Sequence, residues 1–166
     1  YKTIKNYKSA INCYEKFLSK DPTKISVYTI TADLYSKLNG SESLVKQIEL
    51  YKKAYSIDSN NRLVLHGLAY GYEKLGVKDK AKIFYEKLLG NNPTENDYYN
   101  YGGFLISCGD FANGHKYFTH RFNIDDINLK YPADETKKWD LKSDISDKTL
   151  LIHYEQGFGD TIMYCR

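Results

Sequence analysis

The 166-residue sequence is poor in cysteine, proline and tryptophan. Its three cysteines, Cys13, Cys108 and Cys165, are far apart and odd in number, which excludes a disulfide framework and a zinc-binding spacing. No apolar run has the length of a membrane span or the form of a signal peptide. With 42% hydrophobic and 27% charged residues, the composition is globular. We therefore expect a soluble cytoplasmic protein that does not enter a membrane.

Strong charge and metal-ligand spacing are also missing. The net charge is only +3, and lysines alternate with acidic residues instead of clustering, which argues against a nucleic-acid partner. Seventeen tyrosines accompany a single tryptophan, a bias that an AT-rich genome would explain. No histidine lies at a ligand interval from another histidine or a cysteine, so we predict no metal site. The histidines are His66, His115, His120 and His153.

What the sequence does contain is a helical hairpin of about 34 residues, from Arg62 to Thr94. Each of its two helices carries apolar residues at i, i+3, i+4 and i+7, the spacing that places them on one face. Gly76 separates the helices, because a residue without a Cβ readily takes the left-handed conformation that ends a helix. Pro93 closes the unit. The stripes are Leu65, Leu68, Ala69 and Tyr72, then Ala81, Phe84, Tyr85 and Leu88.

Such a short hairpin cannot bury its apolar faces alone, and related copies flank it. Small and aromatic positions recur upstream and downstream at nearly constant spacing, and the pattern resembles the tetratricopeptide repeat family. The departures are a polar Gln47 at a small position, Ser59 in place of a proline, and Arg121 at an apolar position. Four unrelated amphipathic hairpins in a bundle are the alternative. The copies are Ala10, Tyr14 and Phe17; Gln47, Tyr51 and Ala54; and Gly114, Phe118 and Arg121.

Around this unit we expect further helices at Ile25 to Leu38, from Ser41 or Ser43 to about Ile57, and at residues 96–107 and 112–122. Gly102 and Gly103 lower helix stability, so their presence predicts very close helix packing or a bend. The chain starts with Tyr1 and ends within an expected helix, which indicates a piece of a longer protein. Residues 1–122 would hold about four repeats, the first incomplete.

The resemblance implies an all-α, right-handed solenoid whose concave face is lined by the first helix of each pair. Its implied function is binding a protein or peptide; an ordinary solvated groove without a specific ligand is the alternative. The lysine and asparagine clamp for chaperone tails is absent, since Thr29, Asp33, His66 and Tyr70 occupy its positions. Tyrosine suits peptide contact because it offers area at low entropic cost. We predict the ligand-binding residues Asp33, Lys37, His66, Tyr70, Lys74, Asn96 and Tyr99, on a face that also includes Ser26, Thr29, Leu63, Glu73, Gly103, Ile106 and Ser107.

The composition changes after Phe122. Residues 123–148 are rich in charge and form an expected linker with Trp139 as its large anchor. Residues 149–154 are a continuous apolar run typical of a buried parallel strand. A glycine turn with Gly157 and Gly159 and an expected helix at residues 161–166 complete the start of a Rossmann-like domain. Ile162 replaces the third glycine of a dinucleotide fingerprint, so the motif is incomplete.

Together, these segments resemble bacterial tetratricopeptide proteins fused to a heptosyltransferase-like glycosyltransferase of two Rossmann-like halves. Leu141 stands where that family has a glycine after the tryptophan. The resemblance makes Asp160 a candidate base toward the acceptor hydroxyl; a simple helix cap is an equal alternative. A nucleotide sugar would bind only the longer protein. The present chain lacks most of both halves, so we expect it to have no cofactor and no catalysis itself.

A rival interpretation is a pure scaffold without catalytic activity. The expected strand at residues 149–154 has unpaired edges, which predicts fraying, packing on the repeats, or self-association with another copy.

Overall fold

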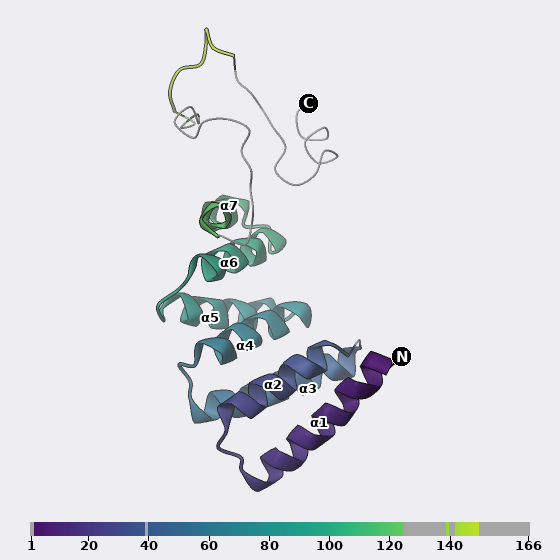
Figure 1. Cartoon of the computed structure of the whole chain (residues 1–166). Coiled ribbons are helices and arrows are strands. Elements are labelled where there is room, and N and C mark those ends of the chain that lie inside the picture. Colours follow the sequence, from purple (N-terminus) through teal and green to yellow (C-terminus); the bar gives the residue numbers. More distant parts are fainter. Residues whose placement is uncertain (1, 39, 125–138, 140–141, 150–166) are drawn as a thin grey trace. The chain divides into compact units, whose positions relative to one another are not determined.

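The structure is a computed structural model, and it describes residues 2–38, 40–124, 139 and 142–149. The chain divides into two compact units, residues 1–121 and residues 122–166. Within the described residues all regular elements are helices (Figure 1). They are α1 (Lys2–Lys20), α2 (Ile25–Ser36), α3 (Ser41–Ile57), α4 (Arg62–Lys74), α5 (Lys78–Leu89), α6 (Glu95–Ser107), α7 (Phe111–Phe118) and the short 3₁₀ helix η1 (Thr119–Asn123).

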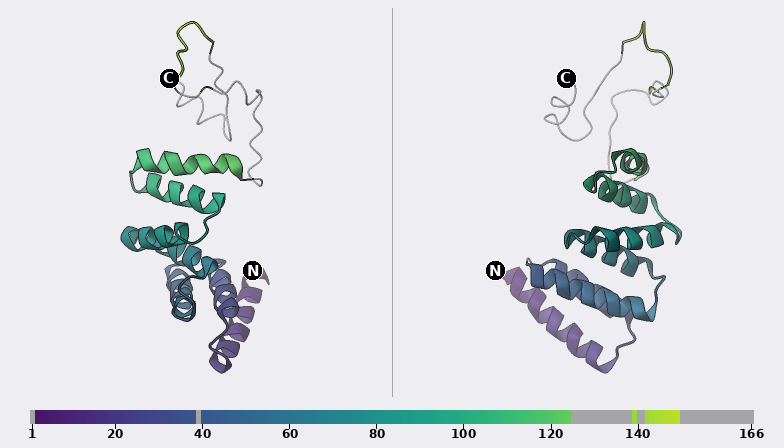
Figure 2. Two further views of the ribbon diagram at one scale, coloured as in Figure 1. Left: turned by 90° about the vertical axis from the view of Figure 1, so that its left-hand side faces the viewer. Right: turned by 180° about the vertical axis from the view of Figure 1, so that it is seen from behind.

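The first unit is a row of hairpins, as the repeat pattern predicts. α2 packs with α3, α4 with α5 and α6 with α7, while α1 lies against α2. Figure 2 shows from two further sides that the hairpins follow one another in chain order. α3 contacts α4, and α5 contacts α6, so each hairpin covers the next. This confirms the predicted all-helical architecture of the repeat region.

The core consists of the stripes that the periodicity identified. Leu65, Leu68 and Ala69 of α4 and Ala81 and Leu88 of α5 are all buried. Leu68, Ala69 and Ala81 join one hydrophobic core with residues of the neighbouring hairpins. Burial of such side chains contributes about 1.5–3 kcal/mol each. The repeat positions of α1 differ from the rest: Phe17, for instance, is 44% exposed.

Several helix ends lie where the sequence places them, and others do not. Gly76 has φ 77° and follows α4, which confirms the predicted break. The expectation that Ser41 or Ser43 caps α3 is wrong: Ser41 is already helical, and Gly40 is the N-cap residue without a side chain to contribute. α2 ends at Ser36 rather than at Leu38, and α7 ends at Phe118, where the chain tightens into η1.

A buried carboxylate ties α4 to the start of α6. Asp97 accepts hydrogen bonds from the backbone N–H of Thr94 at 2.8 Å and from its hydroxyl at 2.9 Å, forming a capping box. The guanidinium of Arg62, at the start of α4, forms an ion pair with the same carboxylate. Because Asp97 is only 3% exposed, its carboxylate needs these hydrogen-bond donors inside the fold.

In the second unit, the indole N–H of Trp139 donates to the carbonyl of Ser143 at 2.9 Å. The expected strand at residues 149–154, the glycine loop with Gly157 and Gly159, Asp160, and the expected helix at residues 161–166 all fall, apart from Thr149, outside the described residues.

Of the two neighbouring glycines in α6, only Gly102 is required by close packing. A Cβ on Gly102 would lie 2.5 Å from the backbone nitrogen of Phe118 and 2.9 Å from the carbonyl oxygen of Gly114. At Gly103 a Cβ would meet nothing within 4 Å. The close approach of α6 and α7 therefore depends on Gly102.

We predict that Gly102→Ala lowers the free energy of unfolding by about 2–3 kcal/mol, because backbone atoms of α7 must move to admit the methyl group. Gly103→Ala is the matched control. It should raise stability by about 0.5–1 kcal/mol through helix propensity alone. Urea unfolding followed by circular dichroism measures both, and equal effects of the two variants would contradict the packing explanation.

Candidate functional site

The exposed sides of the first helices α2, α4 and α6 form one surface, which we call the first-helix face. α2 contacts α4 directly. α4 and α6 are joined by a contact of 3.3 Å between Nε2 of His66 and Nδ2 of Asn100. Most of the predicted groove residues lie on this face and are exposed, namely Ser26, Asp33, Lys37, Leu63, Tyr70, Lys74, Asn96 and Ser107.

Large apolar and aromatic side chains stand out on this face. Tyr70 is 42% exposed, and Leu63, at the start of α4, is 68% exposed. The ammonium of Lys74 lies 5.1 Å from the centre of the Tyr70 ring, a cation–π contact. The sequence analysis missed Ile30 of α2, which is also exposed; its position one turn after Ser26 on the same helix is the signal that could have found it.

Other predicted residues already have partners within the fold. Asp33 accepts a hydrogen bond of 2.6 Å from the hydroxyl of Tyr51. Thr29 is buried and donates to the carbonyl of Ser26. The half-buried ring of Tyr99 packs on Phe118 with the centroids 4.8 Å apart. These three side chains therefore have a structural role within the repeat array.

Tyrosine hydroxyls bonded to carboxylates recur along the array. The partners lie on neighbouring helices, either within a hairpin or between hairpins, at distances of 2.6–3.3 Å. Part of the tyrosine excess therefore has a structural role that composition did not reveal. The pairs are Tyr35 with Glu15, Tyr51 with Asp33, Tyr85 with Glu73, and Tyr101 with Glu86.

These environments favour the neutral phenol. Burial, reinforced by the bond to Glu15, raises the pKa of Tyr35 to about 12. Burial and the charge of Glu86 raise the pKa of Tyr101 to about 12. Burial, with the hydrogen bond to a carboxylate, raises the pKa of Tyr85 even further above its usual value.

A hollow of about 370 Å³ opens where α2 ends beside α3 and α4. It brings together three of the predicted groove residues, namely Lys37, which follows α2, and Tyr70 and Lys74 of α4. His66, Asn96 and Tyr99 are not part of its wall. The rest of the wall consists of Tyr35, Ser36, Leu38, Gly40, Leu44 and Gln47.

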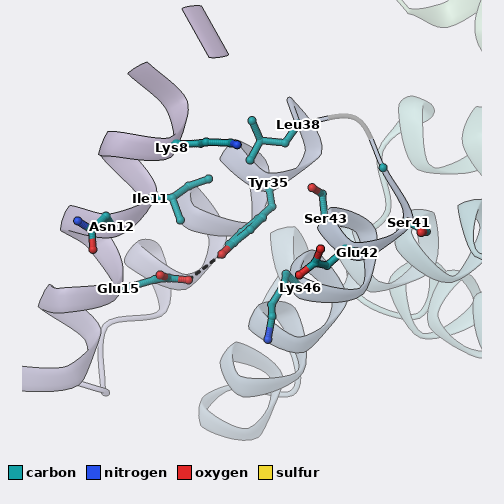
Figure 3. A pocket seen from close by; sticks show the side chains of 11 residues that line it. Lys8, Ile11, Asn12, Glu15, Tyr35, Leu38, Ser41, Glu42, Ser43 and Lys46 are labelled. Carbon is teal, nitrogen blue, oxygen red and sulfur yellow. Dashed lines mark hydrogen bonds between the residues drawn. The ribbon is translucent and has the colours of Figure 1, made fainter. Parts of the chain in front are cut away.

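A second, larger hollow of about 670 Å³ lies between α1, α2 and the start of α3 (Figure 3). The hydrogen bond between Tyr35 and Glu15 crosses it, and charges of both signs surround it, including Lys8 and Glu42. Lys46 at its edge pairs with Glu49 at 3.0 Å. The mixture of signs offers no preference for a charged ligand.

The described residues show no group of three His, Cys, Asp or Glu side chains that could hold a metal ion. Within the same part of the chain, no helix has the length and apolar character needed to cross a membrane.

The family model of the tetratricopeptide repeat matches residues 64–95, the hairpin of α4 and α5. The chain is similar to MamA (19% identity, 75% of this chain and 72% of MamA covered, TM-score 0.66). It is also similar to YrrB, described as a tetratricopeptide protein with an unusual peptide-binding site (19% identity, 69% and 58% covered, TM-score 0.60). The third is TTC0263 of Thermus thermophilus (13% identity, 76% and 69% covered, TM-score 0.63).

The described helices form a tetratricopeptide-type solenoid. This confirms the repeat interpretation of the sequence and favours it over unrelated hairpins in a bundle. A search of the curated proteins finds no significant match.

The tyrosine–carboxylate pairs predict a loss of stability at alkaline pH. A phenol whose pKa is raised by folding stabilises the folded state fully below the unfolded value of about 10. That contribution is lost as the pH rises from about 10 to about 12 for Tyr35 and Tyr101. Tyr85→Phe should lower the free energy of unfolding at pH 7 by about 1 kcal/mol and make its decline above pH 10 shallower.

Urea unfolding at several pH values from about 9 to about 12 measures this decline. Tyr70→Phe, on an exposed side chain, is the matched control and should keep wild-type stability at pH 7. An identical decline in wild type and Tyr85→Phe would show that the Tyr85 pair does not contribute to it.

Proposed function

We propose that the chain is a protein-binding module that holds an extended segment of a partner on the first-helix face. The observation that carries this proposal is the set of exposed apolar side chains on the first helices: Ile30, Leu63 and Tyr70. They lie on helices whose opposite sides are buried in the hydrophobic core, so binding would require little reordering of the face. Leucine, isoleucine and tyrosine in such a position provide contact area that association would remove from water.

The solenoid fold supports this proposal, because stacked hairpins create a long continuous surface rather than an enclosed site. The hollow near Tyr70 adds a place where a side chain of the partner can be anchored. YrrB, which has the same fold, is described as having a peptide-binding site. A scaffold that joins proteins without catalysis is compatible with the same surface.

The test is binding of fluorescent random-sequence peptide pools, measured by anisotropy. Tyr70→Ala should weaken the binding of the tightest pool by about tenfold, since aromatic anchors contribute a large share of contact energy. Ile83→Ala, at an exposed apolar residue of α5, is the matched control and should leave the affinity unchanged. No binding of any pool to the wild type, or equal losses in both variants, would contradict the proposal.

A second candidate concerns the longer protein and stems from residues 155–162, which resemble the glycine loop of heptosyltransferase-like enzymes. We propose that the repeats would then recruit the acceptor, with a nucleotide sugar as donor and Asp160 as the base.

In this second case the Asp160→Asn variant of the longer protein should lose most transfer from a panel of nucleotide sugars, about 10²-fold or more for a general base. Donor consumption followed by chromatography measures it. A variant that keeps wild-type turnover would leave Asp160 as a helix cap, and absence of turnover in the wild type would favour the scaffold.

A further inference from the structure

The hollow between α2, α3 and α4 contains a buried amide without a partner. Gln47 of α3 lines this hollow and is only 5% exposed. Among the described residues, its side chain has no hydrogen bond. The equivalent position in the next repeat is Ala81, which is fully buried. Buried polar groups are nearly always hydrogen-bonded, to protein or to water, so a glutamine in place of a small apolar residue leaves an amide that no described residue satisfies.

Two ammonium groups share the wall of this hollow with Gln47. Lys37 follows the end of α2, and Lys74 ends α4. Neither forms an ion pair with a described residue; the one contact of Lys74 that the structure shows is with the ring of Tyr70. No acidic residue is in the wall. The wall of the hollow thus combines two ammonium groups that form no ion pair with a described residue and an amide that can both donate and accept.

The acidic residues nearest in sequence are committed elsewhere. Asp33, one turn before Lys37 on α2, accepts the hydroxyl of Tyr51. Glu73, next to Lys74, accepts the hydroxyl of Tyr85. These hydrogen bonds hold both carboxylates, which keep their negative charge, on the tyrosines of α3 and α5, and neither carboxylate forms an ion pair with Lys37 or Lys74.

We propose that this hollow is the subsite for an aspartate or glutamate side chain in an extended segment of a partner protein. The carboxylate lies between the ammonium groups of Lys37 and Lys74. The amide of Gln47 bonds to the backbone of the same segment, since a carboxamide offers the donor and the acceptor that a peptide unit needs. The ring of Tyr70 covers the aliphatic part of the bound residue. This inference rests on the proposed peptide binding and adds to it the chemistry of the partner.

The experiment uses the whole chain and three pools of fluorescent peptides with acetylated and amidated ends. The pools have random sequence except for one fixed position, which is glutamate in the first pool, glutamine in the second and lysine in the third. We expect the glutamate pool to bind about tenfold more tightly than the glutamine pool and the lysine pool to bind most weakly. The preference for glutamate should shrink as salt screens the charges.

Three variants separate the groups involved. Gln47→Met keeps the volume and removes the amide, so it should weaken glutamate-pool binding about tenfold while raising the melting temperature by a few degrees. The double variant Lys37→Ala with Lys74→Ala should abolish the difference between the glutamate and glutamine pools. Lys53→Ala removes an exposed lysine from the opposite half of α3 and is the matched control, expected to change neither affinity nor preference.

The outcomes distinguish this inference from the proposed function. If the pools bind the wild type without preference for glutamate, or if Lys53→Ala has the effect of the double variant, the acidic subsite is wrong and peptide binding stands. If Gln47→Met lowers the melting temperature and leaves affinity unchanged, the amide has a structural role only. If binding needs a free carboxyl terminus, the side-chain assignment is wrong. If no pool binds, both proposals fail.

Discussion

The structure depends on tyrosines of the second helices that are inserted between successive first helices. Tyr51 of α3 is one example: its hydroxyl bonds to Asp33 of α2, and a ring carbon lies 2.3 Å from where a Cβ of Gly67 in α4 would be. One side chain thus fixes the spacing of its own hairpin and that of the next. Tyr85 repeats the arrangement within the following hairpin through its bond to Glu73. A missing methyl group at residue 67 is the condition for this contact.

This packing also determines what remains for function. The hydroxyls of the buried tyrosines need acceptors: Tyr51 and Tyr85 take theirs from the first helices, where Asp33 and Glu73 lie, and Tyr101 takes Glu86 of α5. The face keeps its lysines and exposed apolar side chains but has its acidic groups engaged. The carboxylates of Asp33 and Glu73 keep their negative charge, but they are held on the tyrosines and form no ion pair with Lys37 or Lys74. The chemistry of the face follows from the requirements of the core.

The sequence predicts the periodic part of this structure well. Stripes at helical spacing identify the buried faces of α4 and α5, and the left-handed glycine after α4 marks the turn, because both signals are local. Close packing at Gly102 is also predictable, because a glycine within a helix lowers its stability unless close packing requires the missing side chain. The tyrosine–carboxylate pairs, the exposure of Ile30 and the missing partner of Gln47 are not foreseeable. These three features depend on the distances between helices, and the periodicity of a sequence gives no information about those distances. The sequence favours Ser41 or Ser43 as the N-cap residue of α3, because a serine side chain can accept a hydrogen bond at that position. The helix begins at Ser41 itself, so the N-cap position falls on Gly40.

Residues that depart from the repeat pattern can indicate a ligand site when their side chains lack hydrogen-bond partners within the chain. Arg121 departs from the apolar rule, yet its guanidinium lies 4.8 Å from the centre of the Phe118 ring and donates to the carbonyl of that residue at 3.1 Å. That departure is satisfied within the chain and needs no ligand. Gln47 replaces a small residue at a more deeply buried position, and no described residue forms a hydrogen bond with its amide. A polar side chain whose hydrogen bonds are made inside stabilises a structure, whereas one left unpaired in an open hollow lowers stability unless a ligand completes it. A ligand site is therefore better supported at the hollow between α2, α3 and α4, which contains Gln47, than at the end of the repeat array, which contains Arg121.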